Sequence, residues 1–210
     1  MDAWVRWHED YDVPGSSLSV RLALVAGHVA GAVESRPAGT VRLVSACAGQ
    51  GHDVAKALRG HPRRGDVTGR LIELDPVNAA AARERLATAG LSGLEVVEAD
   101  AGVTAPYAGA VPAGVVLMCG VFGNISDEDI RGTIQALPEL AEPGARVIWT
   151  RHRGAPDATP RIRDWFAEAG FREVAFDAPA ELTIGVGVHE LVAPPRPLAE
   201  RRLFTFVVHG

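Results

Sequence analysis

Residues 41–58 read VRLVSACAGQGHDVAKAL, and this stretch decides the fold that the sequence predicts. Residues 41–46 form an apolar, β-branched run typical of a strand, and residues 52–58 predict a short helix. Between them, Gly49 and Gly51 let the backbone pass close beneath a ligand, with the amides of the helix behind it. A turn of this kind is about as common in purely structural roles, so the surrounding sequence has to decide between the two.

The rest of the chain repeats this alternation of strands and helices. Capping residues mark several helix starts, such as Asp75 before Pro76 and Ser126 before Asp129. Such an alternation predicts an α/β domain with a parallel sheet and with helices on both of its faces. We expect further strands at 69–74, 94–99, 114–119, 145–150, 171–176 and 202–208, weaker strand character at 182–191, and helices at 18–33, 76–89, 126–140 and 159–169.

Two acids follow the second and third strands, at the edge of the sheet where α/β proteins bind ligands. Glu73 can accept hydrogen bonds from both hydroxyls of a ribose. Asp100 can accept from an exocyclic amine while the N–H of Ala101 donates to a ring nitrogen, and these two bonds would read an adenine. Taken alone, each acid is more often a solvated carboxylate at a strand end, and only the order of the glycine loop and the two acids favours a ligand site. Val54 stands where a dinucleotide fold needs a small residue, and no Gly-Lys-Ser/Thr is present, so the pattern favours an adenosine ligand without a pyrophosphate.

Four motifs occur in order along the chain: LVSACAGQG (43–51), IELDP (72–76), VEADA (97–101) and VLMCGVF (116–122). Together they resemble the class I S-adenosylmethionine-dependent methyltransferases. The resemblance implies a Rossmann-like, doubly wound sheet of seven strands, mostly parallel, with an antiparallel last strand that residues 202–208 match. It also implies S-adenosylmethionine as the cofactor, one catalytic domain at residues 40–210 and an N-terminal helical cap or lid at residues 1–39.

The resemblance assigns cofactor binding to the loops after these strands. In the family, the first loop passes under the methionine part, the acid at Glu73 binds the ribose and the acid at Asp100 faces the adenine. Ser45 stands where the family usually has an acid and Cys47 where it has a glycine, so the methionine end would need Asp53 or a basic residue from elsewhere. The residues expected to bind the cofactor are Ser45, Cys47, Ala48, Gly49, Gly51, Glu73, Leu74, Asp100, Ala101, Cys119, Gly120 and Phe122.

Methyl transfer asks little of side chains, because it is an in-line displacement that depends on holding nucleophile, methyl group and sulfur collinear in a dry site. A general base is needed only where the nucleophile arrives protonated. Each candidate also has a purely structural explanation. The N-terminal aromatic residues could anchor the terminus to the core, and Asn124 could lie at the entry to a helix. The basic residues after the fifth strand could form a solvated turn, and His189 could be a core or surface residue of its strand. The catalytic candidates are His152, Asn124 and Tyr11, and the substrate-binding candidates are Trp7, Tyr11, Asn124, Arg151, His152 and His189.

The composition excludes several classes of protein. The chain has 210 residues, a net charge of −5 and 47% hydrophobic residues, which fits one globular domain. The acidic balance argues against nucleic acid as the partner, and a small-molecule substrate is expected instead. No apolar run is long enough for a membrane span and the N-terminal residues lack a secretory signal, so we expect a cytoplasmic protein. The sequence leaves the oligomeric state open, with a homodimer as one option.

Cysteines and histidines give no sign of a disulfide framework or a metal site. Cys47 and Cys119 are too few for such a framework, and we expect both to be reduced thiols. In the strand order of the family, the strands that they end are neighbours, which places the two near each other. The histidines lack the spacing of metal ligands, so no metal is expected.

These observations favour a methyltransferase that uses S-adenosylmethionine to methylate an O, N or C nucleophile of a small molecule. Three alternatives stay open: a protein or RNA methyltransferase, a different reaction on the same cofactor, and a regulatory protein that binds the cofactor without turnover.

Overall fold

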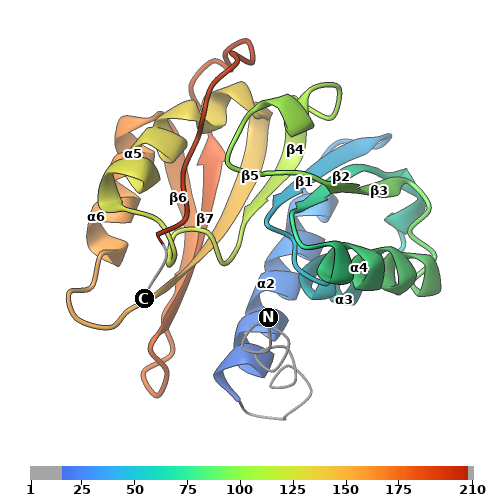
Figure 1. Ribbon diagram of the computed structural model, residues 1–210, viewed down its shortest axis with the longest axis horizontal. Coiled ribbons are helices and arrows are strands. Elements are labelled where there is room, and N and C mark those ends of the chain that lie inside the picture. Colours follow the sequence, from blue (N-terminus) through green and yellow to red (C-terminus); the bar gives the residue numbers. More distant parts are fainter. Residues whose placement is uncertain (1–15, 208–210) are drawn as a thin grey trace.

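The computed structural model describes residues 16–207, which form a seven-stranded sheet with helices on both faces (Figure 1). The strands are β1 (Val41–Ala46), β2 (Val67–Glu73), β3 (Leu94–Glu98), β4 (Ala113–Met118), β5 (Ala141–His152), β6 (Phe171–Asp177) and β7 (Ile184–Leu191). They lie in the order β3-β2-β1-β4-β5-β7-β6, so the chain reverses direction across the sheet between β1 and β4. The first five strands are paired in parallel, and β7 runs antiparallel to β5 and β6. The predicted α/β architecture is confirmed.

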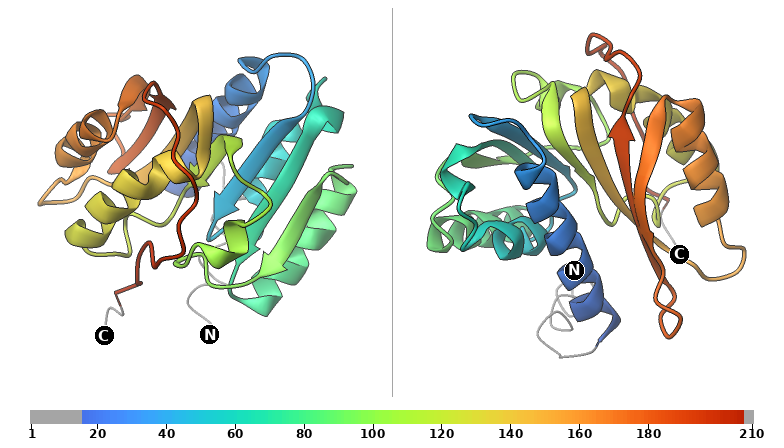
Figure 2. Two further views of the ribbon diagram at one scale, coloured as in Figure 1. Left: turned by 90° about the horizontal axis from the view of Figure 1, so that it is seen from above. Right: turned by 180° about the vertical axis from the view of Figure 1, so that it is seen from behind.

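The helices form two layers that cover the two faces of the sheet (Figures 1 and 2). They are α2 (Ser17–Glu34), α3 (His52–Leu58), α4 (Pro76–Thr88), α5 (Asp127–Ala136) and α6 (Thr159–Glu168). Because side chains alternate along a strand, Leu43 and Leu117 point toward α2, α3 and α4, while Val44 and Val116 point toward α5 and α6. Each face therefore has its own apolar core.

Side chains cap the N-termini of α2 and α4, and the cap of α4 is the expected one. The Ser16 hydroxyl accepts from the amide of Ser19 at 3.0 Å. Asp75 accepts from the amides of Val77 and Asn78 at 2.8 and 3.0 Å, with a proline at the first helical position. The Asp75 cap matters for function because it begins α4 directly after β2.

The cap of α5 is only half of the expected capping box. Ser126 accepts from the amide of Asp129 at 3.1 Å, but the carboxylate of Asp129 accepts from the amide of Thr205 at 2.9 Å. The helix ends at Ala136, earlier than expected. Pro138 cannot continue an α-helix, and the chain goes on as a short 3-10 turn, Leu137–Glu139.

The prediction that residues 202–208 form the last strand was wrong. The described part of this segment makes two isolated bridges, Val103 with Arg202 and Ile125 with Phe206. The antiparallel strand of the sheet is β7, whose glycines had weakened its strand pattern. A Cβ at Gly187 would lie 2.2 Å from the Trp149 ring, so glycine is needed there to let the ring lie flat on the strand.

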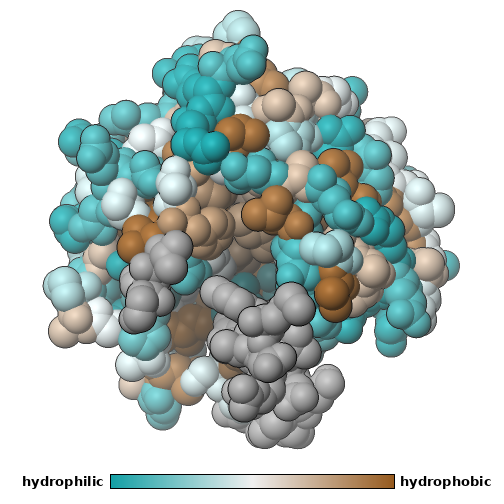
Figure 3. Space-filling model, viewed as in Figure 1, coloured by the Kyte–Doolittle hydropathy of each residue, from teal (hydrophilic) through white to brown (hydrophobic). Residues whose placement is uncertain are grey.

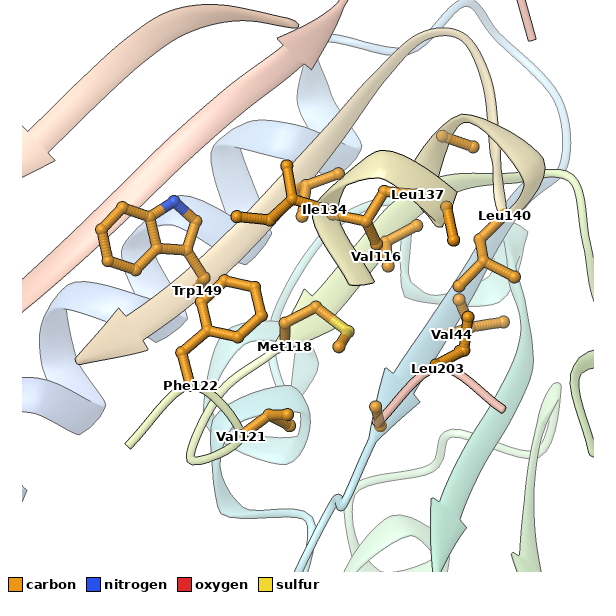
Figure 4. Close-up of a cluster of buried hydrophobic side chains, with 14 of the residues drawn as sticks. Val44, Val116, Met118, Val121, Phe122, Ile134, Leu137, Leu140, Trp149 and Leu203 are labelled. Carbon is orange, nitrogen blue, oxygen red and sulfur yellow. The ribbon is translucent and has the colours of Figure 1, made fainter. Parts of the chain in front are cut away.

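Residues 193–207, here called the C-terminal strap, cover part of the sheet that none of the described helices covers. The connection from β3 to β4 carries only a 3-10 turn, Ala105–Tyr107, where parallel strands usually need a crossover helix. Leu203 and Phe204 of the strap are buried, and the Thr133 hydroxyl of α5 donates to the Leu203 carbonyl at 2.8 Å. Figure 4 shows Leu203 beside Val44 on this face of the sheet. The strap therefore supplies core side chains in place of a helix.

Helix α2 is long and apolar enough to cross a membrane by length and composition alone, and it is the one such helix in the described residues. Core helices pass the same test, and Val25, Val29 and Val33 of α2 are fully buried against the sheet side of the molecule. The proposed division at residues 39 and 40 remains a prediction, since residues 1–15 lie outside the described part of the chain.

The close approach of Trp149 to β7 gives a test of the packing. We expect Gly187→Ala to lower the free energy of unfolding by about 1–3 kcal/mol, because the added methyl group displaces the ring. Gly132→Ala is the matched control, since a Cβ there meets nothing within 4 Å. Urea unfolding measures both, and equal stabilities of the two variants would contradict the packing described.

Candidate functional site

A cavity of about 600 Å³ lies at the carboxyl ends of the strands, around the point where the chain reverses between β1 and β4. Figure 3 shows the hollow near the centre of this face, with hydrophobic residues along part of its border. Its lining includes nearly every residue expected to bind the cofactor, namely Ser45, Cys47, Ala48, Gly49, Gly51, Glu73, Leu74, Asp100, Ala101, Cys119 and Gly120. The location fits the general rule for α/β sheets.

The loop from β1 to α3 has a backbone shape that favours glycine. Cys47, Gly49 and Gly51 have φ values of 49°, 54° and 71°. Left-handed backbone is uncommon for a residue with a side chain, so Cys47 keeps the conformation that a glycine would adopt there. Cys47 therefore has the backbone conformation that favours glycine, although it carries a side chain.

Glu73 joins the end of β2 to this loop. One carboxylate oxygen accepts from the amide of Gly49 at 2.7 Å and the other from the amide of Asp75 at 2.9 Å. The side chain is buried at the cavity wall, and each oxygen keeps a second lone pair for a further donor. Sequence reasoning predicted a ligand-binding acid here but missed its role in holding the loop.

Asp100 lies at the opposite end of the cavity floor, after β3. One of its oxygens accepts from the amide of Gly102 at 2.7 Å and the other from the guanidinium of Arg202 at 3.1 Å. Leu74 lines the same end, and 68% of its surface is exposed. An exposed leucine beside a hydrogen-bonding acid offers a flat apolar surface and a polar edge, which suits a planar ring.

A buried ion pair, Arg21 with Asp53, also lines the cavity. Arg21 of α2 lies 3.4 Å from one oxygen of Asp53, at the start of α3. The other oxygen, Oδ1, is buried and has no hydrogen-bond partner within residues 16–207. Burial raises the pKa of Asp53, and the charge of Arg21 opposes this. Arg21 was missed, although an arginine in line with Val25 and Val29 on the apolar side of α2 was a signal for it.

Both cysteines line the cavity as free thiols. They lie on opposite faces of the sheet, since Cys47 packs with the α5 and α6 core and Cys119 with the α2, α3 and α4 core. Burial raises the pKa of the Cys47 thiol to about 12 and raises that of Cys119 as well. Protonated thiols are poor nucleophiles, so neither side chain is prepared for covalent chemistry.

Phe122 was wrongly predicted to shape the cavity. Its side chain is fully buried in the core, with its ring centroid 6.0 Å from that of Trp149. Figure 4 shows the two rings next to each other. The loop after β4 turns at Gly120, which has a φ of 76°, and this turn directs Phe122 inward.

His189 was also wrongly predicted as a substrate residue and takes the alternative core position. Its Nδ1 accepts a hydrogen bond from the indole N–H of Trp149 at 3.1 Å. Its ring stacks on that of Phe166, with the two ring centroids 4.2 Å apart. Burial lowers its pKa to about 4, so the imidazole is neutral near pH 7.

The end of β5 does not line the cavity. The Arg151 guanidinium donates to the Phe122 carbonyl, and His152 is exposed, with its Nδ1 accepting from Gly154 and its Nε2 2.8 Å from the Thr183 hydroxyl. Both side chains therefore hold loops beside the cavity and do not line it, and the substrate and catalytic roles expected for them remain predictions. Trp7 and Tyr11 lie outside the described residues.

Asn124 is the one described candidate for the acceptor side that does line the cavity. Its amide donates to the Gly120 carbonyl at 2.7 Å, which fixes the loop after β4. Within residues 16–207, no three His, Cys, Asp or Glu side chains gather as a metal site would require. Sequence reasoning missed further lining residues, among them Gln50, His52, Asn78 and Phe206.

Comparison by sequence finds no matching family model and no matching curated protein. Solved structures do match. An O-methyltransferase family protein from Burkholderia thailandensis has a TM-score of 0.66 at 18% identity, over 83% of this chain and 56% of that one. Magnesium protoporphyrin IX methyltransferase from Synechocystis PCC 6803, solved with bound SAM, has a TM-score of 0.69 at 13% identity, over 90% and 91% of the two chains. An RNA methyltransferase from Salinibacter ruber, in complex with S-adenosyl-L-homocysteine, has a TM-score of 0.54 at 18% identity, over 88% and 95%.

These likenesses establish the fold. The chain spans little more than half the length of the Burkholderia protein, and a similar 58% of a CurJ carbon methyltransferase that it also matches. At such identities the shared feature is the architecture, and the activity of this chain has to be argued from its own cavity.

The lowered pKa of His189 predicts a pH-dependent stability. Between its ordinary value of 6.5 and about 4, the unfolded chain binds a proton that the folded chain does not, so the free energy of unfolding falls as the pH falls. His189 accounts for a loss of up to about 3 kcal/mol at pH 4.

We expect His189→Gln, which keeps an acceptor for Trp149, to flatten this dependence. His152→Gln, at an exposed histidine, is the control. Urea unfolding at a series of pH values compares the three proteins, and an unchanged slope in His189→Gln would show that the histidine is not the group responsible.

Proposed function

We propose that this chain, which has the fold of S-adenosylmethionine-dependent methyltransferases, binds S-adenosylmethionine and transfers its methyl group to a small-molecule nucleophile. The observation that carries the proposal is the arrangement of the cavity floor. The glycine loop, Glu73 and Asp100 follow three neighbouring strands and line one cavity, in the order that an amino acid, a ribose and an adenine would need.

In this proposal the nucleoside end uses the two acids and Leu74. Glu73 accepts from the ribose hydroxyls with the lone pairs that Gly49 and Asp75 leave available. Asp100 accepts from the adenine amine, and the exposed face of Leu74 packs against the ring.

The amino-acid end uses the buried pair of Arg21 and Asp53. A guanidinium suits the carboxylate of an amino acid, and the unpartnered Oδ1 of Asp53 suits its ammonium group. Buried polar atoms are rarely left without a partner, so this oxygen supports a ligand with a donor at that point. The pair takes over the role of the acid that is missing at Ser45.

The bound sulfonium supplies an electrophilic methyl group, and the protein has to orient the acceptor and exclude water. Asn124 and Gly120 line the cavity after β4, and Phe206 forms part of its edge. Since neither cavity thiol is ionised near neutral pH, the nucleophile belongs to the acceptor. A net charge of −5 supports a small molecule as the acceptor over RNA.

The first test is cofactor binding. We expect calorimetry to detect binding of S-adenosylhomocysteine, and Glu73→Ala to weaken it by about 2–3 kcal/mol, because a pair of charge-assisted hydrogen bonds is lost. Glu98→Ala is the control, since Glu98 forms an exposed ion pair with Arg83 and does not line the cavity as described for residues 16–207. Thermal melting checks that the loop held by Glu73 stays folded, and equal binding by a folded Glu73→Ala would refute the ribose assignment.

The second test concerns the amino-acid end. We expect the double variant Arg21→Gln, Asp53→Asn to bind S-adenosylhomocysteine at least about tenfold more weakly, since charge-assisted bonds are lost. Binding of 5′-methylthioadenosine, which lacks the amino acid, should not change. The double change leaves no unpaired buried charge. If both ligands lose affinity equally, the pair does not recognise the amino acid.

A further inference from the structure

The C-terminal strap is fixed to the body of the molecule by buried polar contacts. The carboxylate of Glu139, which is only 5% exposed, accepts from the Arg201 guanidinium at 2.8 Å and from the amide of Ala199 at 3.1 Å. Thr104 and Arg201 exchange backbone and hydroxyl hydrogen bonds of 3.0 and 2.9 Å. With Leu203 and Phe204 buried, the strap is an integral part of the fold.

The strap also connects the two loops that border the cavity. It forms a bridge with the loop after β3 at Val103 and a second bridge with the loop after β4 at Ile125. The amide of Val207 donates to the Asn124 carbonyl at 2.8 Å, and Phe206 reaches the cavity edge. Figure 1 shows this dark red segment running down past α5 toward the loop after β4.

The contact with the loop after β3 has no room for a side chain at Gly102. A Cβ there would lie 2.5 Å from the Phe204 carbonyl oxygen and 2.9 Å from Oδ1 of Asp100. The close approach brings Arg202 onto Asp100, where its Nη1 lies 3.1 Å from Oδ2 and 3.3 Å from the Phe204 carbonyl oxygen. The same carboxylate accepts from the amide of Gly102 through its other oxygen.

We propose that the strap forms part of the wall of the cofactor site and that Arg202 is a positioning residue. Arg202 holds the Asp100 carboxylate in the orientation in which it accepts a hydrogen bond from the adenine amine. This inference rests on the proposed function. The two donors, one on each oxygen, fix the plane of the carboxylate and leave its remaining lone pairs for a ligand. The side chains of Arg202 and Asp100 are 54% and 43% exposed, and ion pairs at such positions add little to stability. Orientation of the acid is therefore the main consequence of the pair.

The test compares two ligands that differ at the base. S-adenosylhomocysteine carries an amine that a carboxylate accepts from, and S-inosylhomocysteine carries a carbonyl oxygen that the carboxylate repels. We expect the unchanged protein to prefer the first by about tenfold or more, and Asp100→Asn to lose this preference. Arg202→Gln should reduce the preference about threefold, and Arg202→Lys should restore part of it.

The control is Arg131→Gln, which removes an ion pair with Glu168 of similar exposure, 53% and 52%, away from the cavity. It should leave both dissociation constants unchanged. Three results with Arg202→Gln would overturn the inference: unchanged affinities, an equal loss for both ligands, and tighter binding of S-adenosylhomocysteine, which would make Arg202 a competitor for the acid. If the unchanged protein binds neither ligand, the proposed function itself fails and the inference with it.

Discussion

The cavity depends most on the two hydrogen bonds that the carboxylate of Glu73 accepts. By accepting from the amides of Gly49 and Asp75, it ties the glycine loop to the start of α4, and so joins the ends of β1 and β2. Charge-assisted bonds to backbone amides are strong and directional, particularly where water is excluded. The left-handed backbone at Cys47 and Gly51 can persist because the loop is held at this point. One side chain thus shapes the floor of the cavity and offers acceptor sites to a ligand.

The strap covers apolar side chains on the face of the sheet that also carries α5 and α6. A crossover between parallel strands usually carries a helix, but the connection from β3 to β4 has only a short 3-10 turn, and an apolar sheet face left bare would be unfavourable. Leu203 and Phe204 fill this space together with Tyr107, whose hydroxyl donates to the Ala101 carbonyl at 2.9 Å. The same segment that completes the core then continues to the edge of the cavity. Core packing and the wall of the site are therefore linked through one stretch of chain.

Much of the fold follows from local sequence, because capping residues and apolar periodicity act over a few positions. The expected bounds of α3, 52–58, match the structure, and the Asp75 cap places α4 correctly. Failures occur where tertiary contacts decide. Residues 202–208 have the alternation of a strand, but the described ones bind two loops instead of a neighbouring strand. The glycines of β7 resemble strand breakers until the Trp149 ring is seen against them. The direction of a side chain after a strand is equally non-local, which is why Phe122 and His189 were misplaced and Arg21 was missed.

The contacts of the strap join residues that are far apart along the chain: Asp100 and Arg202 are separated by 102 positions, and Thr104 and Arg201 by 97. Contacts of such high order form late in folding, since the entropy of closing a long loop is lost before the contact is gained. The glycine loop and Glu73, only 24 positions apart, can organise earlier. On this order the cavity floor at Glu73 would be in place before the wall beside Asp100. If the proposed function holds, full affinity for a nucleoside would require the strap to be docked, and a ligand present during refolding would act on the last stage of the process.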